Sequence, residues 1–262
     1  MSDRMPLSDA VRRIAGTERL LVALDFDGTV ALLGDDPMKA RMIPAARTAI
    51  ERLATLPDTT VAFVSGRSLG DLREIAEHLD DSPYLLAGSH GAEFWVPGEG
   101  ALEPEPDDVD AELRDRLFQR VTEATAGMEG VWIEPKTFGF AVHTRVADRR
   151  TAQIANDAID GIIEVEAPHW RRRTGKNIVE FAFRHEGKDS AVATLRERLG
   201  ATAVLFAGDD VTDEDALLSL GPDDVGVHVG GPPSGATVFV ADVKELAALL
   251  EVLATERAST RE

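Results

Sequence analysis

Cysteine is absent from this chain of 262 residues. Its absence excludes disulfides, zinc sites built on thiolates and thiol nucleophiles, and nothing in the composition points to an oxidising compartment. Positive charge is scarce as well, because 28 Lys and Arg residues stand against 47 Asp and Glu, a formal net charge of -19. Such a chain repels phosphate backbones and anionic membrane surfaces, so we expect neither a nucleic acid nor a membrane partner.

Long hydrophobic runs are also missing. No window of the sequence reaches the length of a membrane-spanning helix, and residues 1–16 contain no long apolar core of the kind that a signal peptide carries. What is present is an apolar fraction of 44% in a chain long enough for one large domain or two modest ones. We therefore expect a soluble cytoplasmic protein that folds unaided, and we expect it to be a monomer.

Apolar runs of strand length alternate with helical patterns at both ends of the chain, on either side of a different central pattern. This alternation predicts a parallel sheet with helices on its faces. The segment at 31–44, rich in glycine, proline and aspartate, predicts an irregular flap. The expected elements are a helix at 8–16, strand LLVAL at 20–24, helix 45–56, strand 61–64, helix 69–79, strand YLLAG at 84–88, helix 188–199, strand AVLFAG at 203–208, a short helix, strands DVGVHV and TVFVAD, and a closing helix at 243–253.

The central part of the chain follows another order. The segment 98–108 has the glycine, proline and acidic residues of a linker, and a helix is expected at 109–126. Two strands in VWIEP and FGFAVHTR follow, then a helix at 148–159 and strands around IIEVEAP, HWRRRT and NIVEFAF. We therefore predict an α/β fold: a Rossmann-like core of residues 1–102 and 186–262, with an inserted α+β cap at 103–185.

Polar residues follow three of the core strands. Asp25 and Asp27 follow the first strand, Ser65 follows the second, and Asp209 follows AVLFAG. Ligands bind outside the carboxyl ends of an open parallel sheet, so these motifs are expected to converge although they lie far apart in sequence. Clustered carboxylates repel one another unless a cation or a proton offsets the charge, and hard oxygen ligands suit Mg²⁺. Ser65, the backbone N–H after it and Lys188 supply what a phosphoryl group needs.

Four motifs in order, DFDGT, SGR, the Lys of GKDSA and GDDVTDED, resemble those of the haloacid-dehalogenase-type phosphatases. Within that superfamily, GSHGAE, the pair in IEPK and the string GDDVTDEDA resemble the trehalose-6-phosphate phosphatases, and the resemblance covers about residues 20–253. It implies a phosphoric monoester hydrolase of trehalose biosynthesis with a cap of the C2 type. Such an enzyme would convert trehalose 6-phosphate to trehalose and phosphate.

The resemblance also implies a role for each motif residue. Asp25 would be the nucleophile that becomes an aspartyl phosphate, and Asp27 the general acid and then the general base. Ser65 and Lys188 would neutralise the phosphoryl oxygens. The Asp25 carboxylate, the backbone carbonyl of Asp27 and Asp209 would hold Mg²⁺, with Asp210 and Asp213 supporting these ligands. The residues expected to bind phosphate or sugar are Gly28, Thr29, Gly66, Arg67, His90, Glu134, Lys136, Lys176 and Glu180, with His143 and Arg145 as weaker candidates.

Several of these residues have a plainer interpretation. Glu134 and Lys136 lie two apart on a strand and could form a surface ion pair. His90 could cap the backbone instead of contacting substrate, and Glu214 and Asp215 are typical of a helix N-terminus. The run 171–173 is typical of a solvated hairpin, and Trp132 and Trp170 are expected in the core. Two other functions stay open: a phosphatase for sucrose phosphate or for a glucosyl- or mannosylglycerate phosphate, and a non-catalytic sensor of phosphorylated sugars.

Overall fold

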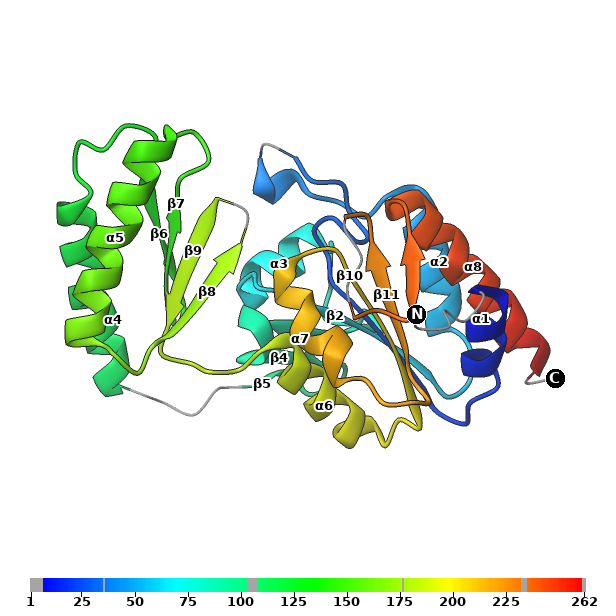
Figure 1. Cartoon of the computed structure of the whole chain (residues 1–262). Coiled ribbons are helices and arrows are strands. Elements are labelled where there is room, and N and C mark those ends of the chain that lie inside the picture. The colour runs from blue at the N-terminus through cyan, green and yellow to red at the C-terminus, as the bar shows by residue number, and fades with distance from the viewer. Residues whose placement is uncertain (1–6, 35, 103–107, 176, 232–234, 261–262) are drawn as a thin grey trace. The chain divides into compact units, whose positions relative to one another are not determined.

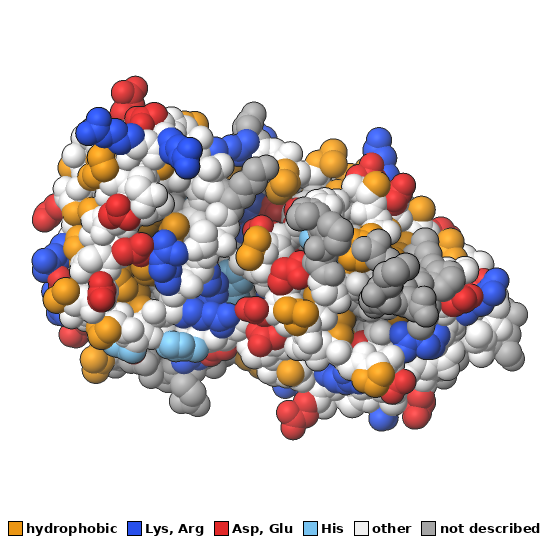
Figure 2. Space-filling view, in the orientation of Figure 1, with side chains coloured by type: hydrophobic (Ala, Val, Ile, Leu, Met, Phe, Trp, Pro, Cys, Tyr) orange, Lys and Arg blue, Asp and Glu red, His pale blue; other side chains and the backbone are white. Residues whose placement is uncertain are grey.

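The computed structural model describes residues 7–34, 36–102, 108–175, 177–231 and 235–260. The chain divides into two compact units, Met1–Glu103 with Glu186–Glu262, and Pro104–His185. In the space-filling view, acidic and basic side chains are interspersed on the visible face of each unit (Figure 2). Among the described residues, no helix combines the length and the apolar character that crossing a membrane requires.

The first unit is built on a single sheet of eight strands in the order β12-β11-β10-β1-β2-β3-β4-β5 (Figure 1). The strands from β12 to β3 pair in parallel, whereas β4 and β5 form an antiparallel hairpin at one edge. A parallel-rich α/β core is therefore confirmed. The bounds are Leu20–Leu24 for β1, Thr59–Val64 for β2, Leu85–Gly88 for β3, Glu93–Val96 for β4, Gly100–Leu102 for β5, Ala203–Gly208 for β10, Val225–Val229 for β11 and Val238–Val240 for β12.

Helices cover both faces of this sheet because its central strands are apolar on both sides. In β1 the side chains of Leu20, Val22 and Leu24 pack in one core cluster with helices α1, α2, α3 and α8. Leu21 and Ala23 point the other way and pack with α6 and α7. This burial on both faces is the pattern expected of parallel strands. The bounds are Leu7–Ala15 for α1, Pro44–Ala54 for α2, Leu69–Ile75 for α3, Lys188–Leu199 for α6, Val211–Ser219 for α7 and Val243–Thr260 for α8.

The second unit is a four-stranded antiparallel sheet in the order β6-β7-β9-β8, with two helices on one face (Figure 1). Apolar side chains of the sheet, such as Phe140 and Phe181, pack with Leu117 of α4 and Ile159 of α5 in a separate core. The chain order helix–strand–strand, repeated, is the order expected from the sequence. The bounds are Asp108–Ala124 for α4, Trp132–Lys136 for β6, Gly139–His143 for β7, Arg149–Glu166 for α5, Arg171–Gly175 for β8 and Ile178–Ala182 for β9.

Some expected elements are wrong in detail. The apolar run IIEVEAP is not a strand, because α5 continues to Glu166 and buries Ile163 on its inner face. The segment expected to be only a linker contains β5, which pairs with β4, and its residues 103–107 lie outside the described residues. The closing helix α8 runs to Thr260. The flap contains a short 3₁₀ helix, Pro37–Lys39.

The extension of α8 carries a fully buried arginine, Arg257. Its guanidinium donates to the backbone carbonyls of Ala15 (3.0 Å), Thr17 (2.9 Å) and Asp58 (2.7 Å). These bonds connect α8 to the end of α1, to the loop between α1 and β1, and to the residue before β2. Replacing Arg257 by Ala removes these three bonds and a fully buried side chain, although Asp58 O still accepts the N–H of Leu20 and Ala15 O the hydroxyl of Thr260. We expect the free energy of unfolding, measured by denaturant titration, to fall by about 2–5 kcal/mol.

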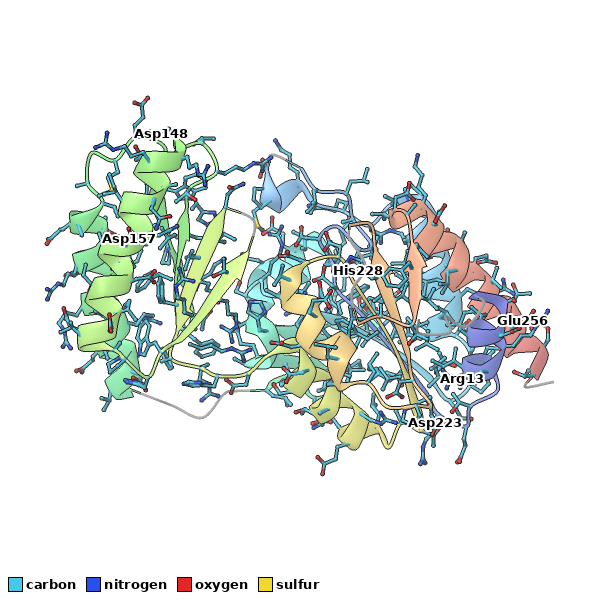
Figure 3. The ribbon with its side chains drawn as sticks, viewed as in Figure 1. Arg13, Asp148, Asp157, Asp223, His228 and Glu256 are labelled. Carbon is cyan, nitrogen blue, oxygen red and sulfur yellow. The ribbon has the colours of Figure 1, made fainter. Side chains whose placement is uncertain are left out.

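The matched control for Arg257→Ala is Glu256→Ala on the same helix (Figure 3). Glu256 is only partly buried, so we expect its loss to change the free energy of unfolding by less than about 0.5 kcal/mol. Equal losses for the two variants would show that the contacts of Arg257 do not stabilise the core.

Candidate active site

The three strands that precede the polar motifs are neighbours in the order β10-β1-β2. Because they are parallel, their carboxyl ends lie at the same edge of the sheet, and Asp25, Ser65 and Asp209 follow directly. The backbone N–H of Asp25 donates to Ala207 of β10 at 2.9 Å, which continues the strand pairing up to the first carboxylate. The order of the strands thus explains why three residues that are far apart in the sequence lie at one edge of the sheet.

A buried lysine lies between two buried carboxylates at this edge. Lys188 Nζ donates to Asp25 Oδ1 at 2.6 Å and to Asp213 Oδ1 at 2.7 Å, and all three side chains are nearly or fully buried. Lys188 begins α6, whereas Asp213 lies in the first turn of α7. Asp25, Asp209 and Asp213 each offer a carboxylate oxygen within 4.8 Å of the other two. This cluster of acids could hold a metal ion.

The electrostatics of the cluster follow from burial. Burial raises the pKa of Asp25 well above its ordinary value; Lys188 opposes this shift, and the charges of Asp213 and Asp209 add to it. Burial, followed by the charge of Asp213, raises the pKa of Asp209 to about 7. For Lys188 burial acts to lower the pKa, but the charges and hydrogen bonds of Asp213 and Asp25 outweigh it and raise the pKa. The site therefore has more negative charge than one lysine offsets.

Two glycines allow the acids to approach the backbone closely. Gly28 has a φ of +77°, and a Cβ there would lie 2.0 Å from Asp209 Oδ2. A Cβ on Gly208 would lie 2.2 Å from Asp213 Cγ. Between Asp25 and the flap, Thr29 is fully buried and its hydroxyl donates to Asp25 Oδ2 at 3.2 Å. Both oxygens of Asp25 are thus held by the protein, one by Lys188 and the other by Thr29.

The loop after β2 packs against the loop after β3. Ser65 is buried, and its backbone carbonyl accepts the N–H of His90 at 2.9 Å. The ring of His90 lies over Gly66, where a Cβ would be 2.6 Å from two ring atoms. His90 is itself buried and has a φ of 58°. Its ring therefore packs on the loop of Ser65, and contact with a substrate stays a prediction.

Arg67 was expected to bind phosphate or sugar, but in the structure its guanidinium pairs with Asp27. Nε donates to Asp27 Oδ2 at 2.6 Å and Nη2 to Asp27 Oδ1 at 2.8 Å, the two-pronged geometry that arginine forms with carboxylates. Nη2 also donates to the carbonyl of Pro37 in the flap at 2.9 Å. The carboxylate of Asp27 is therefore held outside the cluster of Asp25, and Arg67 connects it to the flap.

The acids of GDDVTDED separate into different environments. Asp210 is the N-cap of α7 and accepts the N–H of Val211 at 2.7 Å. Asp213 is fully buried, and its Oδ2 accepts the N–H groups of Asp209 (3.1 Å) and Asp210 (3.0 Å). Glu214 lies 3.8 Å from a nitrogen of His228. Asp213 is therefore the fully buried member of the cluster and Asp209 its partly buried member, whereas Asp210 caps the helix.

The residues expected to bind sugar lie in the second unit. Glu134 on β6 accepts Lys136 Nζ at 2.6 Å and His143 Nε2 at 2.6 Å, so the ion pair considered from the sequence is present. Burial acts to raise the pKa of Glu134, but the hydrogen bond from His143 and the charge of Lys136 outweigh it and lower the pKa to about 2. Glu180 on β9 lies 3.7 Å from Arg173 of β8. Lys176 lies outside the described residues.

Three other expectations for this unit have mixed outcomes. Trp170 is 6% exposed and packs in the core, as expected. Trp132 is 44% exposed, so its assignment to the core is wrong. In the run 171–173, the first part of β8, Arg172 is exposed and pairs with Asp160, but the side chain of Arg173 is only 10% exposed. A fully solvated hairpin is therefore wrong for Arg173.

The fold of the chain is that of haloacid-dehalogenase-like hydrolases. A hydrolase of this class from B. subtilis matches with a TM-score of 0.60 and 16% identity over 87% of this chain and 97% of that one. The C-terminal domain of trehalose-6-phosphate phosphatase from C. albicans matches with a TM-score of 0.79 and 20% identity over 96% of this chain and 97% of that one. At these identities the matches show the fold alone.

The family model described as trehalose-phosphatase matches residues 23–235, and the chain belongs to that family. The resemblance to the trehalose-6-phosphate phosphatases, indicated by GSHGAE, IEPK and GDDVTDEDA, is therefore confirmed. A trehalose-phosphate phosphatase from Mycobacterium marinum is 30% identical in an alignment of 247 positions that covers 85% of this chain and 58% of that protein. The chain thus spans little more than half the length of this relative.

Proposed function

We propose that the protein is a Mg²⁺-dependent phosphatase that hydrolyses trehalose 6-phosphate to trehalose and phosphate. The observation that carries the proposal is the buried arrangement of Asp25, Lys188 and Asp213 at the carboxyl ends of β1 and β10, in a chain of the trehalose-phosphatase family. A carboxylate held between a lysine and a hydroxyl, beside further acids, is suited to attack a phosphorus atom.

In the proposed reaction an oxygen of Asp25 forms a bond to phosphorus while the bond from phosphorus to the sugar oxygen breaks. Asp27 donates a proton to the departing sugar oxygen. A water molecule then attacks the phosphorus of the aspartyl phosphate and gives a proton to Asp27, and the bond to Asp25 breaks to release phosphate. Because Arg67 holds both oxygens of Asp27, the pair must open or shift for this carboxyl group to reach the sugar oxygen.

Lys188 and Ser65 are proposed to stabilise the charge on the phosphoryl oxygens. Lys188 is held by two carboxylates, so its ammonium is in place before substrate binds, which is the arrangement that makes electrostatic stabilisation effective. Gly28, Thr29 and Gly66 are proposed to form the backbone around the phosphate. Both glycines are required by their neighbours, because a Cβ on Gly28 would clash with Asp209 and one on Gly66 with the ring of His90.

The donor set fits Mg²⁺. Asp25, Asp209 and Asp213 offer only carboxylate oxygens within 4.8 Å of one another, which suits a hard cation and does not favour a soft one. We propose that Asp25, Asp209 and the carbonyl of Asp27 hold the ion, with Asp213 beside them and Asp210 supporting the helix start. When bound, the ion would offset the carboxylate charge and polarise the phosphoryl group.

Metal binding is expected to release protons. Because the pKa of Asp209 is raised to about 7, this group is largely protonated below neutral pH in the metal-free protein and must lose its proton to bind a cation. The apparent affinity for Mg²⁺ should therefore fall by up to about tenfold for each unit of pH below about 7, and level off above it. Calorimetric titration with Mg²⁺ at several pH values, in two buffers with different ionisation enthalpies, measures both the affinity and the protons released.

The control for this titration is Asp223→Asn, because Asp223 is exposed and lies on the loop between α7 and β11 (Figure 3). It should leave the pH dependence unchanged, whereas Asp209→Asn should remove most of it and weaken binding. An affinity that is constant between about pH 5.5 and 8 would contradict a metal site at these acids.

The unit Pro104–His185 is proposed to select the sugar through Glu134, Lys136 and Glu180. A site that hydrogen-bonds hydroxyl groups rejects compounds that leave its polar groups unpaired. Phosphate release from trehalose 6-phosphate, sucrose 6-phosphate, glucosyl- and mannosylglycerate phosphates and p-nitrophenyl phosphate, each with and without Mg²⁺, tests the proposal. Trehalose 6-phosphate should lead by orders of magnitude. Another leading sugar would overturn the substrate, and no release from any compound would favour the sensor. A cytoplasmic location and a monomeric state stay predictions.

A further inference from the structure

One face of the four-stranded sheet is polar. The opposite face packs on the helices through Ile133 of β6, Phe140 and Val142 of β7 and Phe181 of β9. Side chains alternate along a strand, so the residues between these lie on the other face. Register places Trp132 of β6 opposite His143 of β7, and Glu134 opposite Ala141, two positions along. The polar face thus carries an aromatic pair next to the carboxylate of Glu134.

The aromatic pair is parallel and held in place. The rings of Trp132 and His143 are stacked with centroids 4.5 Å apart and an interplanar angle of 1°. His143 Nε2 donates to Glu134 Oε2 at 2.6 Å, so the imidazole under the indole is oriented by the same carboxylate that Lys136 binds. Three side chains on two strands therefore position one another, and each depends on the pairing of β6 with β7.

The outer face of the indole is open. Trp132 is 44% exposed although one ring face is covered by His143. Its strand, β6, is an edge strand of the sheet, and no other strand among the described residues pairs with its outer side. A single exposed apolar side chain is common on protein surfaces, but tryptophan is enriched at interfaces because it combines a large apolar ring with a polar N–H group. What distinguishes Trp132 is that its ring is fixed by the stack on His143 and lies on the same sheet face as Glu134 and Lys136. Glu134 and Lys136 form an ion pair on the same sheet face as Trp132. The carboxylate of Glu134 can accept hydrogen bonds from a ligand at the ring, and the ammonium of Lys136 can donate them.

A sugar ring is the ligand whose chemistry fits this combination. A pyranose has one face of C–H groups, which packs on an aromatic face, and hydroxyl groups around its edge, which need the acceptors and donors of Glu134 and Lys136. A phosphate group does not fit, because the face of an indole carries negative charge density and attracts cations rather than anions. The ring therefore suits the sugar part of a substrate and not its phosphate.

We propose that Trp132 is a stacking platform for a pyranose ring of the sugar phosphate, and that His143 is a positioning residue that supports the indole and orients Glu134. This inference rests on the proposed function and deepens it, because it assigns the apolar part of sugar recognition to a residue on the edge strand. Contact with sugar then depends on an aromatic face as well as on hydrogen bonds, and small phosphate esters without a ring do not use it.

The test compares Trp132→Ala, Trp132→Phe and the control Val165→Ala, which removes an exposed apolar side chain from α5 in the same unit. For each variant, kcat and KM are measured with trehalose 6-phosphate and with acetyl phosphate, which has no ring. Trp132→Ala should lower kcat/KM for trehalose 6-phosphate, relative to kcat/KM for acetyl phosphate, by about tenfold. The loss should come mostly from a higher KM for trehalose 6-phosphate, because an aromatic contact contributes roughly one power of ten to affinity. Trp132→Phe should recover most of the ratio, and Val165→Ala should leave it unchanged.

A second measurement does not depend on turnover. Tryptophan emission is followed while trehalose, sucrose or glucosylglycerate is added to the whole protein. A change in the wild type that is lost in Trp132→Phe, while Trp95 and Trp170 remain, supports the platform for that sugar even if no sugar phosphate is hydrolysed and the proposed function fails. Hydrolysis of a sugar phosphate with an unaltered ratio in Trp132→Ala overturns the platform and leaves the function standing.

Two further outcomes overturn the platform. One is the absence of any Trp132-dependent emission change with all three sugars. The other is a tryptophan emission that changes with protein concentration but not with added sugar, together with a dimer that is lost in Trp132→Ala. In that case the exposed indole is a contact between two copies of the chain. His143→Ala should lower the substrate ratio less than Trp132→Ala does, and His143→Gln, which can still donate to Glu134, should recover part of it.

Discussion

Asp25→Asn should lower kcat for trehalose 6-phosphate by about 10³-fold or more, because an amide cannot form the covalent intermediate. The substitution preserves the size of a side chain that is nearly fully buried, so the fold should persist. It also removes one negative charge from a cluster in which burial and the acids at 209 and 213 already raise the pKa of Asp25. Phosphate release gives kcat, and mass measurement after acid quenching of the wild type detects the phosphorylated chain.

The control for this prediction is Asp223→Asn, an exposed acid of the same unit, which should keep full activity. Residual activity above about one tenth of the wild-type value in Asp25→Asn would exclude Asp25 as the nucleophile. A phosphorylated peptide that does not contain Asp25 would exclude it independently of the rates. Loss of activity together with a collapse of the fold would be detected by circular dichroism, and the mass measurement on wild type would then decide the role.

Lys188→Met should have the second largest effect, because it removes the cation between two buried carboxylates. We expect kcat to fall by about 10²–10³-fold, the range seen when one preorganised donor to a developing charge is lost. We also expect the free energy of unfolding at pH 8 to fall by about 3–5 kcal/mol, since Asp25 and Asp213 lose the buried partner at 2.6 and 2.7 Å.

The loss of stability in Lys188→Met should depend on pH in a stated direction. In the wild type the charge of Lys188 opposes the rise in the pKa of Asp25 that burial causes. Without the lysine, the pKa of Asp25 therefore rises further than in the wild type. A group whose pKa is raised on folding destabilises the fold when it is ionised, so the penalty is present at high pH and decreases as the pH falls through the raised pKa. Denaturant titration at several pH values should therefore show the difference from wild type shrinking towards acid pH.

Lys244→Met is the matched control, because Lys244 is an exposed lysine near the start of α8. It should leave activity unaltered and stability within about 0.5 kcal/mol of wild type. A stability loss in Lys188→Met that grows towards acid pH would contradict the ion pairing assigned to Lys188. Saturating Mg²⁺ should restore part of the stability, because a bound cation offsets the same carboxylates.

Much of the core could be derived from the sequence because parallel strands have a simple signature. Continuous apolar runs such as LLVAL bury both faces, and a polar residue at the end of the run marks the edge of the sheet. The motifs therefore predicted that Asp25 and Asp209 follow strands whose carboxyl ends lie at the same edge of the sheet. Periodicity failed at IIEVEAP, where a short run of branched apolar residues suits a strand but continues α5 in the structure.

The contacts among site residues were harder to derive. Arg67 lies two residues after Ser65 and was predicted to bind phosphate or sugar. Its pairing with Asp27 and with the carbonyl of Pro37 depends on where the flap lies, which the sequence does not reveal. Trp132 alternates with Glu134 and Lys136, a signal that could have placed it on the polar face. That it lies open depends on β6 being the edge strand, which no local pattern reveals.

The sequence by itself determined the class of fold, the family and the residues that end the core strands, because these depend on local periodicity and on short motifs. Only the tertiary structure decided that Asp213 belongs to the buried cluster while Asp210 caps a helix, that Lys188 joins Asp25 to Asp213, and that the indole of Trp132 stacks on His143. The reason is that burial and side-chain contacts depend on packing between segments far apart in the chain, and alternation along one segment carries no information about its partner.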